Sequence, residues 1–162
     1  MKRQVILAAF LALPIAGSAV GESGKDIAGT WQLVSSVVER DGSKIDQFGP
    51  DPKGMLSLSP DGHFMLTIIA AGLPKFASGN RANGTAEENK AVVSKSIAMI
   101  GTYAVDPAAK TVIWRTESAT FPNWNGTEQK RLIATLNGEE LKYVTPNASS
   151  GGVGTVTWRR VK

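Results

Sequence analysis

The strongest constraint on the fold is a series of short runs of β-branched and aromatic residues, each bounded by a turn signal. Runs of this length and composition are typical of β-strands, with glycine, proline, asparagine and aspartate in the turns between them. Most of the connections are short, and Asn137-Gly138 is a typical two-residue hairpin turn. We predict eight strands, over residues 28–38, 55–59, 63–70, 99–105, 111–118, 126–136, 141–145 and 153–161.

One segment departs from this pattern, between the third and fourth predicted strands. Residues 71–85 are rich in glycine, alanine and asparagine and show no hydrophobic period. Thr85 and Glu88 then have the spacing of a helical capping box, and residues 86–97 contain good helix formers. We predict one short helix inserted after the third strand.

The predicted elements favour an all-β fold, an eight-stranded antiparallel up-and-down barrel. Closing the sheet removes exposed strand edges, and eight strands enclose packed side chains or one small ligand. A β-sandwich is the alternative, because a pattern of strands does not reveal closure. The 162 residues contain no internal repeat or linker, which favours one domain.

The N-terminus has the features of a secretory signal peptide. Lys2 and Arg3 precede an apolar run over residues 5–16, and the small residues Gly17 and Ala19 follow. The run is shorter than the ~20 residues of a membrane-spanning helix. We expect a signal peptide over residues 1–19, a barrel domain over residues 20–162, and export to the periplasm or the medium. An uncleaved anchor is the alternative.

Charge and residue composition exclude several functional classes. Removal of residues 1–19 takes away two of the 18 basic residues and none of the 14 acidic ones, which leaves a net charge of +2. Nucleic-acid-binding domains are usually far more basic, so we expect no nucleic-acid partner. There is no cysteine and His63 is the single histidine, so we predict no metal site and no cofactor. The sequence does not indicate an oligomeric state.

Two short stretches narrow the fold further. Residues 29–31, Gly-Thr-Trp, resemble the Gly-x-Trp signature of lipocalins, in which the tryptophan closes one end of the barrel. Residues 158–160, Trp-Arg-Arg, resemble the lipocalin element whose arginine lies over that tryptophan. The resemblance implies structural roles for Gly29, Trp31, Trp158 and Arg160, with a cation–π contact between the arginine and the tryptophan.

A wider resemblance covers residues 27–161. The stretches GTWQLVSSVVERDGSKIDQFGPDPKGMLSLSPDGHF, IGTYAVDPAAKTV and FPNWNGTEQKRLIATLNGEELKYVTP resemble the bacterial and fungal lipocalin-like domain family. This resemblance implies a lipocalin-like barrel. It does not imply a particular reaction, because one fold serves many functions.

The predicted strand over residues 126–136 contains the best candidate for a polar binding group. Side chains alternate between the two faces of a strand, so Gln129 and Arg131 share one face and Glu128 and Lys130 the other. The second pair suits solvent, which places Gln129 and Arg131 inside the barrel. A buried guanidinium needs a partner. Either a ligand carboxylate or Glu117 on the preceding strand would provide one.

Aromatic residues supply candidate pocket walls. We predict Trp114, Tyr103 and Trp124 as ligand contacts, with Trp124 at the mouth, and further candidates are Phe121 and Tyr143. Ordinary core packing is the alternative for each of them. Phe76 and the predicted helix are candidates for a cover over the mouth.

The sequence thus predicts an exported protein that binds a small hydrophobic or amphipathic ligand with its polar or anionic end inside the barrel. One alternative is a barrel enzyme of the isomerase, cyclase or dehydratase type. Glu117 or Tyr103 would then be the acid–base group, and Arg131 would stabilise an anion. A packed barrel without a ligand is a third reading.

Overall fold

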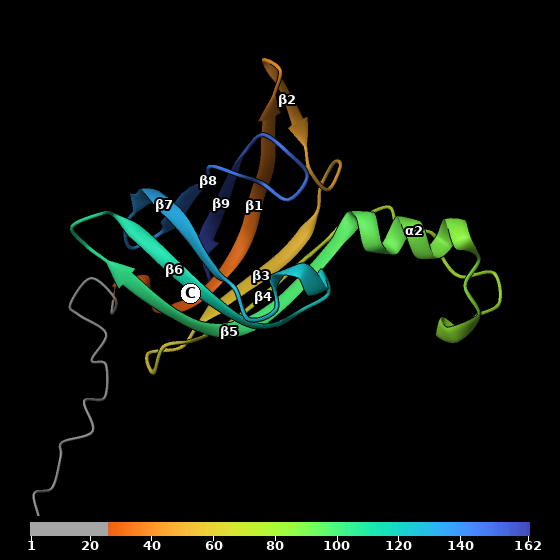
Figure 1. Ribbon diagram of the computed structural model, residues 1–162, viewed down its shortest axis with the longest axis horizontal. Helices are drawn as coiled ribbons and strands as arrows, with labels where there is room; N and C mark the ends of the chain where they lie inside the picture. Colours follow the sequence, from red (N-terminus) through yellow and green to blue (C-terminus); the bar gives the residue numbers. More distant parts are fainter. Residues whose placement is uncertain (1–25) are drawn as a thin grey trace, which may run out of the picture.

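The structure is a computed structural model that describes residues 26–162 (Figure 1). The predicted signal peptide over residues 1–19 lies outside the described residues. The strands are β1 (Gly29–Arg40), β2 (Ser43–Asp46), β3 (Lys53–Leu58), β4 (His63–Ile69), β5 (Ser96–Asp106), β6 (Thr111–Ala119), β7 (Glu128–Leu136), β8 (Glu140–Thr145) and β9 (Val153–Arg160). The helical elements include α2 (Ala86–Lys95) and the 3₁₀ turns η1 (Arg81–Asn83) and η2 (Pro122–Trp124).

The sheet closes on itself to form a barrel. Every pairing is antiparallel, and β1 pairs with β3 on one side and with β9 on the other. Trp31 is opposite Leu56 of β3, and Leu33 is opposite Trp158 of β9. Strands β1 and β3 to β9 therefore make the eight-stranded antiparallel barrel that the sequence predicts, and the sandwich alternative is excluded.

The ninth strand, β2, extends a hairpin beyond the barrel wall. Asp41 and Gly42 have φ angles of 52° and 73°, as both central residues of a tight hairpin turn require. The four residues of β2 are exposed and pair with residues 37–40 of β1. Its polar sequence gives no strand signal, and because of this extra strand α2 follows the fourth strand rather than the third.

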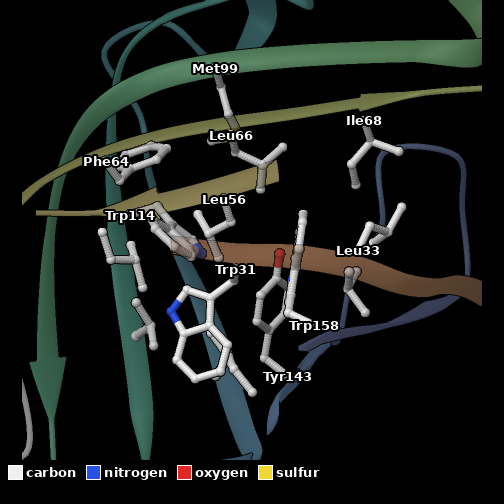
Figure 2. Close-up of a cluster of buried hydrophobic side chains, with 14 of the residues drawn as sticks. Trp31, Leu33, Leu56, Phe64, Leu66, Ile68, Met99, Trp114, Tyr143 and Trp158 are labelled. Carbon is white, nitrogen blue, oxygen red and sulfur yellow. The ribbon is translucent and has the colours of Figure 1, made fainter. Parts of the chain in front are cut away.

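Tryptophan side chains fill much of the barrel interior (Figure 2). Trp31, Trp114 and Trp158 are almost completely buried, and leucines and Phe64 pack around them. Full burial of one large apolar side chain contributes about 1.5–3 kcal/mol, so this cluster is a principal source of stability.

One end of the barrel, here the closed end, contains the start of β1, the β3–β4 turn and the end of β9. There Trp31 donates a hydrogen bond to the Ile27 carbonyl (2.9 Å). The Arg160 guanidinium lies 4.0 Å from the centroid of the Trp31 ring and donates to the Ala28 and Gly138 carbonyls. Gly29 has a φ of 138°, and a Cβ at this position would lie 2.5 Å from the guanidinium. Only glycine fits this close approach without strain.

The opposite end, the open end, contains the longer connections. Residues 70–95 form an arm that extends away from the barrel and includes α2 (Figure 1). The capping box at Thr85 and Glu88 is present. No residue of α2 is buried, and Val93 is 73% exposed. Within the described residues, none of the helices has the length and apolarity needed to cross a membrane.

Candidate functional site

A cavity opens between three loops at the open end of the barrel. Its volume is about 70 Å³. The residues that line it are Ser36, Gln47, Phe48, Leu66, Ile68, Ile97, Met99, Trp124, Arg131, Tyr143, Thr145, Ala148, Ser149, Gly154 and Val156. Pockets for drug-sized ligands usually measure ~300–1,000 Å³, so a ligand of that size requires side chains or loops at the mouth to move.

Arg131 is the charged side chain of this cavity. It is only 9% exposed, because β7 directs it inward between Gln129 and Ile133. It donates hydrogen bonds to the Gln129 side-chain oxygen and to the Lys130 carbonyl. A guanidinium has five N–H donors, so three of them have no acceptor among residues 26–162. Burial lowers the pKa of Arg131 from its ordinary value, but a guanidinium stays protonated at neutral pH.

Tyr143 lines the cavity beside Arg131. Its ring is buried, and burial raises the pKa of its phenol, while the positive charge of Arg131 and the indole of Trp158 act in the opposite direction. The phenol is therefore neutral at pH 7 and does not neutralise the guanidinium. No salt bridge to Arg131 forms within residues 26–162, so its charge has no protein counterion there.

Among residues 26–162, three buried side-chain atoms have no hydrogen-bond partner, on residues that do not themselves line the cavity: Gln129 Nε2, Thr116 Oγ1 and Trp158 Nε1. The orientation of the Gln129 amide is fixed chemically, because a guanidinium has only donors and must face the oxygen. The amide nitrogen therefore points elsewhere. Thr116 lies on the adjacent strand, where its N–H bonds to the Thr127 carbonyl, and it faces the same interior as Gln129. Trp158 lies beside Tyr143 (Figure 2).

The structure brings together three of the residues singled out as ligand contacts. Gln129 bonds to Arg131, and Trp124 lines the cavity from η2. The Trp124 ring meets Phe121 edge to face, with the two ring centroids 5.4 Å apart, and Phe121 itself does not line the cavity.

Two predicted contacts lie elsewhere in the barrel. Trp114 is opposite Gln129 in the sheet but packs in the core, 4.5 Å from Phe64 between ring centroids. The Tyr103 hydroxyl donates to the Ser59 carbonyl (2.9 Å), near the closed end. Neither residue lines the cavity.

Glu117 does not meet Arg131. Trp114 and Thr116 point inward from β6, so the alternate residues Arg115 and Glu117 point outward, and Glu117 is exposed. On this outer face Arg115 forms an ion pair with Glu128 (3.2 Å). The suggestion that Glu117 neutralises Arg131, or acts as a base facing it, is therefore wrong.

The expected cover over the mouth is also absent from this structure. Phe76 packs inside the arm, where its ring lies against Gly84, and α2 leads away from the barrel. The cavity is bordered instead by Phe48 and by residues 145–149 of the β8–β9 loop.

Sequence reasoning missed Phe48, Thr116 and Ser36. For Thr116 the signal was present, because it is two residues from Trp114 and shares its face. Ser36 gives no such signal. Counting by twos from Trp31 places it outside the barrel, but a β-bulge between Leu33 and Ser35 turns it inward.

Comparison with known proteins agrees with the fold. Residues 28–161 match the family described as the lipocalin-like domain. A 4'-hydroxy-3'-methoxypropiophenone carrier protein of Aspergillus oryzae is 30% identical over 104 residues, which cover 58% of this chain and 93% of that protein.

Solved structures show weaker similarity. A lipocalin-like protein from Bacteroides uniformis has a TM-score of 0.44 and 14% identity, covering 84% of this chain and 99% of that one. A redesigned β-barrel has a TM-score of 0.47 and 13% identity, covering 90% and 100%. The barrel assignment rests on the strand pairing above, not on these similarities.

Proposed function

We propose that this chain, which belongs to the lipocalin-like domain family, is a carrier that binds a small, mostly apolar molecule in the open half of the barrel. Arg131 is the observation that supports this most. Its buried positive charge has no carboxylate partner among the described residues, and such an arrangement is costly unless a ligand supplies the partner. The polar or anionic end of the ligand would contact this guanidinium.

The walls of the cavity define the rest of the ligand. Leu66, Ile68, Met99 and Val156 are apolar, and Trp124 offers an aromatic surface at the mouth. A site of this kind favours a small, flat, mostly apolar body with one polar end. The name of the A. oryzae relative describes a carrier of a small aromatic ketone, which is consistent with this size and chemistry.

Entry requires the β8–β9 loop to move. The Ser150 carbonyl accepts a hydrogen bond from Arg40 (3.0 Å), and the Ser150 hydroxyl from Gln47 (3.4 Å). Both bonds are exposed, and Gly151 and Gly152 with positive φ follow in the loop. Exposed hydrogen bonds contribute little net stability, so this loop is the part of the mouth that opens most easily.

Export is the second part of the proposal. The charge and apolar pattern of residues 1–19 supports a signal peptide that directs the chain to the periplasm or the medium. N-terminal sequencing of the protein isolated from its own host tests this. A mature N-terminus at Val20 agrees with the proposal, and an intact Met1 in the cytoplasmic fraction contradicts it.

Native mass spectrometry tests the carrier function. We expect the wild-type protein isolated from its own host to retain a small molecule, and the Arg131→Met variant to lose it. Arg115→Met is the matched control, because this arginine lies on the outer face of the adjacent strand. A wild-type protein that carries nothing, and that retains none of a panel of small aromatic acids and phenols, contradicts the proposal.

A further inference from the structure

The interior around Arg131 has more hydrogen-bond donors than acceptors. In the part of the chain that the structure describes, three N–H groups of Arg131 have no acceptor, and neither does the Gln129 amide nitrogen beside it. The other polar side chains that line the cavity can accept as well as donate, and none of them carries a negative charge: Ser36, Gln47, Tyr143, Thr145 and Ser149.

This imbalance constrains the chemistry of a ligand. Buried donors without acceptors cost free energy, and a ligand recovers this cost only if it brings oxygen acceptors. A ligand group that mainly donates, such as an ammonium or a neutral amide nitrogen, would leave the imbalance in place. The complementary ligand is therefore rich in acceptors and poor in donors.

The positive charge of Arg131 favours an ionised acceptor on the ligand over a neutral one. Of the residues that line the cavity, only Arg131 and Tyr143 are titratable, and the Tyr143 phenol is neutral. No negative side chain among the cavity residues competes for the guanidinium. An ionised oxygen makes a stronger, charge-assisted hydrogen bond with a guanidinium than a neutral oxygen does.

We propose that the ligand is bound as an oxyanion, an ionised phenol or carboxylate on an aromatic body, with the charged oxygen at Arg131. A second, neutral acceptor oxygen, such as a carbonyl or an ether, then accepts from the remaining N–H groups of Arg131. This inference rests on the proposed function, and it adds the protonation state of the ligand and a second recognition element. Gln129 holds the guanidinium in place and is thus a positioning residue.

Three probes test it on the ligand-free protein. The first is 4'-hydroxy-3'-methoxypropiophenone, which ionises at its phenol. The second is its 4'-O-methyl ether, which has nearly the same shape and does not ionise, and the third is 3,4-dimethoxybenzoate, a carboxylate. Equilibrium dialysis measures binding, and difference absorption spectroscopy separately reports whether the bound phenol is ionised.

We expect the bound phenol to show the phenolate spectrum at a pH below its free pKa. Its apparent pKa should fall by about one unit or more, as expected beside an opposite charge. The methyl ether should bind at least tenfold more weakly. Arg131→Met should abolish the phenolate spectrum because it removes the positive charge. Gln129→Glu should abolish it because the new carboxylate pairs with Arg131 in place of the ligand. Arg115→Met should leave the spectrum unchanged. Circular dichroism confirms that each variant is folded.

Each result leads to a different conclusion. If the protein binds 3,4-dimethoxybenzoate but neither of the other probes, and Arg131→Met does not bind it, the ligand is an oxyanion of the carboxylate kind. A bound phenol that keeps its neutral spectrum, with a methyl ether that binds equally well, overturns the inference and leaves the carrier function intact. Retention of none of the three probes counts against the carrier function itself.

Discussion

Replacement of Gln129 by glutamate places a carboxylate where the Gln129 oxygen already meets Arg131. The substitution keeps the side-chain length and the hydrogen bond to the guanidinium. It also removes the buried Nε2 donor that has no acceptor. We therefore expect this single atom change to stabilise the ligand-free protein.

The expected change in stability follows from two favourable effects and one opposing effect. Removing an unpaired buried donor recovers about 1–3 kcal/mol. Pairing the buried guanidinium is favourable as well, but desolvation of the new carboxylate offsets much of that gain. We expect a net increase of about 1–2 kcal/mol in the free energy of unfolding. For a domain of this size, that raises Tm by about 4–8 °C.

The pH dependence identifies the mechanism. Arg131 should hold the pKa of the new carboxyl below the ~4.3 of an unfolded glutamate. The added stability is then fully present above about pH 4.3, and it is lost as the pH falls through the folded-state pKa. Denaturant unfolding at pH 7 and at pH 3 measures this difference.

Gln129→Met is the matched control, because it removes the unpaired donor without adding charge. The glutamate variant should be more stable than the methionine variant at pH 7, and this advantage should shrink as the pH falls to 3. A glutamate variant that is less stable than wild type at pH 7 would refute the reasoning. An advantage that does not change with pH would show that Arg131 is not an unpaired charge.

Three further predictions concern the rest of the barrel. Arg160→Ala should lower the free energy of unfolding by about 2–3 kcal/mol, because the variant loses the contact with Trp31 and the hydrogen bonds to main-chain carbonyls. Urea unfolding measures this change, and an unchanged midpoint would contradict a structural role for Arg160. Thr85→Ala should destabilise α2 by about 1 kcal/mol, which amide hydrogen exchange would show as faster exchange in α2 alone. Equally faster exchange in the barrel strands would contradict an arm that is independent of the barrel. Arg40→Ala should increase the rate of probe dissociation in stopped-flow experiments, because it removes a hydrogen bond that holds Ser150 of the β8–β9 loop. This bond is exposed, so Tm should change by no more than about 2 °C. An unchanged dissociation rate would contradict the loop as the entry point.

Much of the barrel was predictable from the sequence because strand patterns and turns are local. Alternation along residues 126–136 also places Arg131 inside and Lys130 outside, as the structure has them. The same rule, counted from Trp114, places Glu117 outside. Adjacency of the two strands alone is therefore not enough to pair Glu117 with Arg131.

Other features depended on information that is not local. The bulge that turns Ser36 inward arises from the pairing of β1 with β9, which joins opposite ends of the chain. The direction of the arm was equally hidden, since α2 has no buried face that would fix its docking. The strand β2 escaped notice because all four of its residues are exposed.

The pairing of β1 with β9 has a consequence for the order in which this protein folds. The hydrogen bond from Arg160 to the Ala28 carbonyl joins residues 132 positions apart. A growing chain therefore exposes the β1 edge until its last strand has been made. Barrel closure is a late event, and contacts between distant residues slow folding. A truncation before Val153 would leave two open sheet edges, which are templates for aggregation. The final eight-residue strand thus completes the fold, and it also protects the first strand from other chains.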